Sequence, residues 1–190
     1  MGASGSAVKW SSVTLQEIWN EIAAAREALV TEVRGLSDAQ LAFQPSPGKW
    51  SIGEILDHLS LAERSIARVA SRVLQQAAGR GLIGEPGSMD VPPHQIDLEL
   101  FNAPATAPES VLPSLGRPLE RLLASLEESR ERLLEVSSRA DGRVVGNVTI
   151  RHFQLGELHF YQWLVLEGAH ESKHLTQIRL IKAQPRFPRS

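Results

Sequence analysis

A chain of 190 residues has the length of one ordinary globular domain. With 42% hydrophobic and 22% charged residues it is typical of folded proteins, which excludes disordered and collagen-like chains. A net charge of -2 gives no field that would draw the whole molecule to nucleic acid or an anionic membrane. The absence of cysteine excludes disulfides, thiolate metal sites and a cysteine nucleophile, so a catalytic metal ion would depend on His, Asp or Glu.

The first residues and the hydropathy of the chain bear on its location. Residues 1–8 are small and polar and lack the apolar segment of a secretory signal. No stretch approaches the roughly 20 apolar residues that span a bilayer. We therefore expect a cytoplasmic protein with no membrane partner, folded as a single domain over residues 1–190 with flexible tails at 1–10 and 185–190.

Two amphipathic helices are predicted in the first half of the chain. Apolar residues recur at steps of three and four over residues 15–36, which indicates one buried helix face. The same alternation is stricter over residues 52–73, where Ser51 and Glu54 form a capping-box pattern at the start. Two prolines and a glycine in residues 45–48 separate the two helices.

The periodicity then disappears over residues 79–106, where glycine and proline are frequent. A connection of this length is uncommon inside a compact domain, and we interpret it as a crossover between two helix pairs. Thr106 and Glu109 form another capping-box pattern. A third helix is predicted over residues 115–136, with Pro118 expected to bend or split its start.

The last third of the chain contains one more long helix. Residues 144–150 are β-prone but too isolated to predict a sheet. A helix is predicted over residues 156–183, followed by prolines at 185 and 188. Four long amphipathic helices, with one long crossover between the second and the third, predict an all-α four-helix bundle.

Histidines are the residues most suited to metal chemistry. His170 and His174 are four residues apart on the last helix, so both rings project from one face at a spacing that can ligate one ion. His58 flanks the buried stripe of the second helix. Three histidines from facing helices would leave coordination positions for water or substrate, which is a catalytic arrangement. A hydrogen-bonded core role explains the same spacing, and both interpretations stay open.

The segment from His170 to His174 also matches H-E-x-x-H, the helix signature of zinc metalloproteases, with Glu171 in the general-base position. No Asp, Glu or His follows to supply a third ligand, and Gln177 stands where the extended signature has glycine. Glu167 and Glu171 each precede a histidine by three residues, as in di-iron bundles, but there the two units lie on different helices. The sequence therefore disfavours a peptidase and a di-metal carboxylate centre.

An ordered set of motifs carries a family resemblance. Residues 49–59 contain W-S-x-x-E-x-x-x-H-L, residues 155–164 contain L-G-E-L and Y-Q-W-L, and residues 170–178 contain H-x-x-x-H-x-x-Q-I. This combination covers nearly the whole chain and resembles the DinB-like (damage-inducible, YfiT-like) superfamily. His152-Phe153 stands where that family often has a His-Pro pair.

The resemblance implies an up-up-down-down four-helix bundle, usually a homodimer, that holds a divalent metal, commonly nickel or zinc. Its ligands would be one histidine of the second helix and two of the fourth. In this chain the implied ligands are His58, His170 and His174, the set that the spacing also indicates.

Several further residues are candidates for the surroundings of the site. Gln177 and Glu167 lie one turn from a ligand position and would orient an imidazole, although each also suits a surface or packing role. Trp50 and Trp163 would form pocket walls or pack in the core. His159 lies about 16 Å along the helix from His170 and is excluded from the same ion.

Two other features carry less information. His94 lies in the crossover with no partner that the sequence identifies. The basic residues near the C-terminus suit a helix end, so nucleic acid is not an expected partner.

These patterns favour an enzyme that acts on a small-molecule substrate, with a metal-activated water that makes it a metal-dependent hydrolase. The family resemblance supports an alternative, a metal-dependent thiol S-transferase that borrows bacillithiol, mycothiol or glutathione. A third interpretation is a non-catalytic bundle that binds metal or a small ligand. The fold alone does not decide between them.

Overall fold

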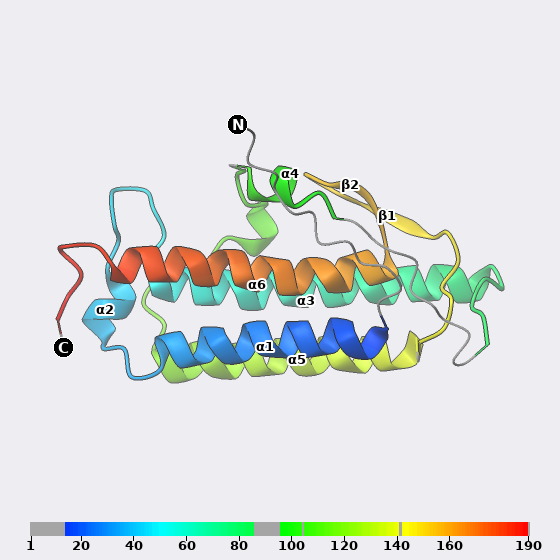
Figure 1. Ribbon diagram of the computed structural model, residues 1–190, viewed down its shortest axis with the longest axis horizontal. Coiled ribbons are helices and arrows are strands. Elements are labelled where there is room, and N and C mark those ends of the chain that lie inside the picture. Colours follow the sequence, from blue (N-terminus) through cyan, green and yellow to red (C-terminus); the bar gives the residue numbers. More distant parts are fainter. Residues whose placement is uncertain (1–13, 86–95, 104, 141, 190) are drawn as a thin grey trace, which may run out of the picture.

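The computed structural model describes residues 14–85, 96–103, 105–140 and 142–189. Four long helices form the bundle in Figure 1: α1 (Leu15–Val33), α3 (Ile52–Gly79), α5 (Leu119–Ala140) and α6 (Phe160–Lys182). Helix α3 packs against both α5 and α6, and α1 packs against α6. The prediction of an all-α four-helix bundle is confirmed.

The starts of the first helices follow the capping patterns in the sequence. At α3, the Ser51 hydroxyl accepts from the Glu54 amide at 3.2 Å, and the Glu54 carboxylate accepts from the Ser51 amide at 2.8 Å. The short helix α2 (Asp38–Ala42), which the sequence analysis did not predict, is capped in the same way by Ser37. The capping box expected at Thr106 is wrong, because the chain stays extended through Pro108 and the 3-10 turn η1 (Glu109–Val111) has no side-chain cap.

The third long helix begins later than the sequence predicts. Helix α5 starts at Leu119, and Leu115 is 74% exposed instead of buried on a helix face. Proline disfavours a helical conformation in the residue before it, so Pro118 sets the boundary. Gly116, with φ 72°, also turns the chain out of the helical region just upstream.

A two-stranded hairpin precedes α6, and it corrects two expectations. Strand β1 (Thr149–His152) pairs antiparallel with β2 (Gly156–His159), so the β-prone segment is not isolated, and α6 begins at Phe160 instead of residue 156. His152 closes the turn, because its Nδ1 accepts from the amides of Gln154 and Leu155 at 3.2 and 3.1 Å. Burial lowers the pKa of His152 to about 4, so the ring stays neutral and keeps this acceptor.

The crossover contains a second short helix, α4 (Leu98–Asn102), which lies near the hairpin in Figure 1. The side-chain amide of Gln154 donates to the carbonyl of Leu100, and Phe101 is buried. These contacts place α4 over the bundle beside α6. At the C-terminal end, the ring of Phe187 lies 5.5 Å from that of Phe43. Residues 1–10, expected as a tail, and His94 lie outside the described residues.

Charged side chains divide the bundle interior into two apolar clusters. One cluster contains Ile22 and Ile66, and the other contains Leu29 and Leu59. Along each of the four long helices, residues of one cluster are followed in the chain by residues of the other, and one or two buried or partly buried charged residues lie at the boundary. We call these residues the charge layer: Arg26, Glu63, Arg130, Glu167 and Glu171.

Four members of the charge layer form a closed set of ion pairs. Arg26 contacts Glu171 at 2.5 Å and Glu63 at 2.8 Å, while Arg130 contacts Glu63 at 2.5 Å and Glu171 at 3.0 Å. The fifth, Glu167, is fully buried, and its two oxygens have no hydrogen-bond partner among the described residues. Burial, with repulsion from Glu63 and Glu171, raises the pKa of Glu167 well above its ordinary value and favours its neutral form.

Removal of one charge from this layer should destabilise the fold strongly. Arg130→Met leaves Glu63 and Glu171 buried with fewer partners, so we expect the free energy of unfolding to fall by about 3–5 kcal/mol. Arg139→Met is the matched control on the same helix, since its exposed pair with Glu135 contributes about 0–1 kcal/mol. Urea unfolding of both variants measures the difference, and equal losses would contradict a stabilising role for the layer.

Candidate metal centre

Three histidines from two helices meet beside the charge layer. His58 comes from α3, and His170 and His174 come from successive turns of α6. The Nε2 atom of His170 lies 3.2 Å from that of His58 and 3.0 Å from that of His174. Each of the three residues offers one ligand nitrogen, and these three nitrogens all lie within 4.8 Å of one another. The structure therefore brings together the three histidines that the sequence selected.

The outer nitrogens of two rings are fixed by hydrogen bonds. Nδ1 of His58 lies 2.8 Å from the carbonyl oxygen of Val111 in η1, and Nδ1 of His174 lies 2.9 Å from the side-chain oxygen of Gln177. Both partners are acceptors, so each Nδ1 carries the proton and donates it. This tautomer leaves the Nε2 lone pair free and directed toward the cluster, as a metal ligand requires. Gln177 thus contacts the ring that the sequence analysis assigned to it.

The three rings are held in the neutral form. Burial lowers the pKa of His58, and it lowers the pKa of His174 to about 3. The pKa of His170 also lies well below its ordinary value, because of burial and of repulsion from the other two histidines. Neutral imidazole is the form that binds a metal ion, so the cluster is ready to bind one at neutral pH.

Two aromatic residues border the cluster. The ring of Trp50 lies 4.6 Å from that of His58 and 6.4 Å from that of His174, and the ring of Phe101 lies 6.0 Å from that of His170. Trp163 lies elsewhere: its indole nitrogen donates to the carbonyl of Leu158 at 3.2 Å, under the hairpin. Of the two tryptophans considered as pocket walls, the structure places Trp50 at the cluster and Trp163 at the hairpin.

The two glutamates considered for the site belong to the charge layer. Glu171 is bound to Arg26 and Arg130, so the carboxylate in the H-E-x-x-H segment is not free to act as a general base. Glu167 is fully buried in the same layer, and no hydrogen bond joins it to an imidazole in the described ranges. Neither carboxylate therefore forms a hydrogen bond with a histidine of the cluster in the described residues.

An anchor that the sequence analysis missed holds the segment after η1 in place. Asp57, only 2% exposed, accepts from the amide of Ser114 at 2.7 Å and forms an ion pair with Arg117. Arg117 also donates to the hydroxyl of Ser125 on α5 at 2.9 Å. This anchor fixes the chain three residues beyond Val111, whose carbonyl orients His58. The one sequence signal for this anchor is the position of Asp57, an acidic residue directly before the buried His58.

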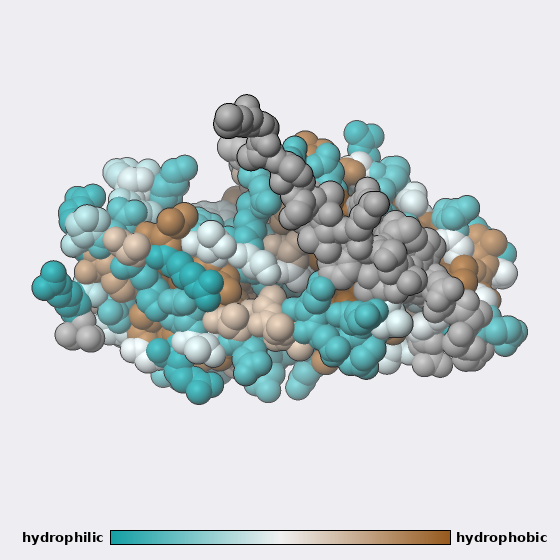
Figure 2. Space-filling view, in the orientation of Figure 1, coloured by the Kyte–Doolittle hydropathy of each residue, from teal (hydrophilic) through white to brown (hydrophobic). Residues whose placement is uncertain are grey.

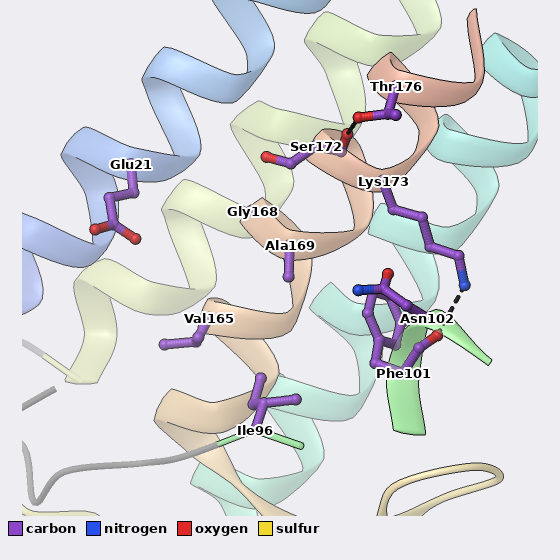
Figure 3. A pocket seen from close by; sticks show the side chains of 10 residues that line it. All are labelled: Glu21, Ile96, Phe101, Asn102, Val165, Gly168, Ala169, Ser172, Lys173 and Thr176. Carbon is purple, nitrogen blue, oxygen red and sulfur yellow. Dashed lines mark hydrogen bonds between the residues drawn. The ribbon is translucent and has the colours of Figure 1, made fainter. Parts of the chain in front are cut away.

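A cavity of about 530 Å³ lies beside the cluster, between α1, α4 and α6 (Figure 3). Phe101 lines the cavity and its ring lies 6.0 Å from that of His170, so this side chain lies between the cavity and the cluster, and no histidine is among the lining residues. Lys173, which lines it as well, donates to the Phe101 carbonyl at 2.8 Å. The volume lies in the range of small-molecule sites.

Comparisons with known proteins agree with this architecture. The sequence profile of the DinB superfamily matches residues 21–178. A Bacillus subtilis (strain 168) protein, described as uncharacterized protein YuaE, is 30% identical over 169 residues, which cover 87% of this chain and 95% of that protein. The crystal structure of TT2238, described as a four-helix bundle protein, superposes with a TM-score of 0.60 at 25% identity and covers 87% of this chain and 98% of that one. This chain therefore belongs to the DinB superfamily, as the motifs predicted.

In the part of the chain that the structure describes, no helix combines the length and the apolar character needed to cross a bilayer.

The orientation of the imidazoles can be tested without a metal ion. In metal-free protein at pH 8, we expect His58 and His174 to carry the proton on Nδ1, because a carbonyl and an amide oxygen accept from them. Long-range proton–nitrogen correlation spectra of the histidine rings report the tautomer directly. Gln177→Ala should remove the preference at His174 and leave His58, the internal control, unchanged. A predominant Nε2–H form at both rings would contradict the assigned geometry.

Proposed function

We propose that this protein binds one divalent metal ion, nickel or zinc, through Nε2 of His58, His170 and His174. The convergence of three neutral imidazoles carries the proposal. Ligands at about 2.0–2.1 Å from a tetrahedral ion lie about 3.3 Å from one another, close to the separations of 3.0 and 3.2 Å in the cluster. Affinity for nickel and zinc is high at imidazole sites, so the donor set suits both ions.

We further propose that the centre is that of a metal-dependent hydrolase for a small-molecule substrate. A divalent ion on three histidines would act as a Lewis acid and lower the pKa of water toward about 7. The residues of the chain orient and border the centre: Val111 and Gln177 hold two of the rings, while Trp50 lies beside His58 and Phe101 beside His170. The adjoining cavity would receive the substrate.

One observation favours a thiol S-transferase as the alternative. Glu171 is committed to two arginines, so the motif carboxylate is not available to take a proton from water. A thiol, with an ordinary pKa of about 8.5, ionises more readily than water at the same ion and so depends less on such a base. Because the chain has no cysteine, the sulfur would come from a low-molecular-weight thiol such as bacillithiol, mycothiol or glutathione.

Single substitutions of the proposed ligands test metal binding. His58→Ala, His170→Ala and His174→Ala should each lose most of the bound metal, because two imidazoles hold an ion far more weakly than three. His94→Ala and His159→Ala are the controls and should keep a full complement. Elemental analysis of the purified variants measures the ratio of metal to protein. Stoichiometric metal in the His58 variant would remove α3 from the site.

Assays of the same metal-loaded preparations separate the candidate reactions. Hydrolysis of nitrophenyl esters in thiol-free buffer, lost in His174→Ala, supports the hydrolase. A rate that appears only when a low-molecular-weight thiol is added with chlorodinitrobenzene supports the transferase. If metal is bound and neither assay shows turnover, the hydrolase proposal is wrong and the protein is a non-catalytic binding bundle.

A further inference from the structure

Lys173 carries a positive charge that no acidic side chain compensates within the described ranges. It is partly buried on α6, directly before His174. Its Nζ donates to the Phe101 carbonyl at 2.8 Å and lies 4.7 Å from the centre of the Phe101 ring. The ion pairs of the described residues do not include it, whereas Lys182 on the same helix pairs with Glu32 at 2.5 Å. A partly buried ammonium of this kind is suited to an anionic partner.

Two acidic residues that adjoin cluster histidines in the chain already have cationic partners. Asp57 is paired with Arg117, and Glu171 with Arg26 and Arg130. The charge of Lys173 reaches the cluster, since it contributes to the lowered pKa of all three histidines. A divalent ion on three neutral rings would keep its full charge, so the centre and Lys173 together would be strongly positive.

The cavity beside the cluster provides room for a molecule that meets this charge. Its wall combines the apolar side chains of Ile96, Phe101 and Val165 with Lys173 at one edge. In Figure 3 the ammonium of Lys173 reaches from α6 across to the α4 backbone, on the side of α6 away from Glu21. The cavity therefore offers an apolar surface with one cation, Lys173, at one edge and the carboxyl group of Glu21 on the opposite side.

We propose that Lys173 binds the carboxylate of the substrate, so that the enzyme acts on small organic carboxylates with an apolar body. The carboxylate would replace the Phe101 carbonyl as the partner of Nζ, and the apolar body would lie against the Phe101 ring. One ammonium matches the single charge of a carboxylate. This inference rests on the proposed function, because it assumes that the substrate enters beside the metal centre.

A matched pair of ligands tests the inference in the full-length zinc-loaded protein. 3-Phenylpropanoate and 3-phenylpropanamide have nearly the same shape and differ in charge. Isothermal titration calorimetry should show roughly ten-fold tighter binding of the carboxylate, as expected for a charged hydrogen bond. Lys173→Gln should abolish the preference, Lys173→Arg should retain most of it, and the exposed control Lys49→Gln should leave it unchanged.

The outcomes distinguish this inference from the proposed function. Metal content is measured first, and equal zinc in all variants shows that the centre is intact. If the preference persists in Lys173→Gln, the carboxylate is held by the metal alone and the role of Lys173 is wrong. If the wild-type protein holds its full zinc and binds the carboxylate and the amide equally, the inference is wrong and the proposed function still stands. A protein that binds no metal overturns the proposed function and the inference with it.

Discussion

Three imidazole nitrogens as close as those of His58, His170 and His174 repel one another through their lone pairs unless a cation or a shared proton lies between them. Burial opposes added protons, because it lowers the pKa of each ring. The metal ion proposed above would satisfy all three nitrogens together. Val111 and Gln177 support this arrangement, because they accept from Nδ1 of His58 and His174 and leave Nε2 of both rings free.

The helices that carry these nitrogens are joined by buried charge. Glu171 follows His170 directly, and Glu63 lies little more than one turn after His58, so ion pairs to Arg26 and Arg130 hold α3 and α6 together next to the cluster. The same pairing removes these carboxylates from the chemistry of the site. Lys173 is left without an acidic partner among the described residues, and this observation supports the proposal of an anionic substrate.

Helical periodicity was sufficient to predict the bundle and the three histidines, because the face of a helix on which a residue lies is a local property. The partner of a buried charge is not local: Arg26 and Glu171 are 145 positions apart. For this reason the sequence suggested a base or orienting role for Glu171 and Glu167, whereas the fold places both in the charge layer. The hairpin over residues 149–159 was missed because strands of four residues are too short to show a period of two.

X-ray absorption at the metal edge of the purified protein tests the shared cation most directly. The account predicts three imidazole nitrogens at about 2.0–2.1 Å from the metal ion in the wild type, and two in His58→Ala. A spectrum with two or fewer imidazoles in the wild type, unchanged by that substitution, would show that α3 and α6 do not bind a common ion.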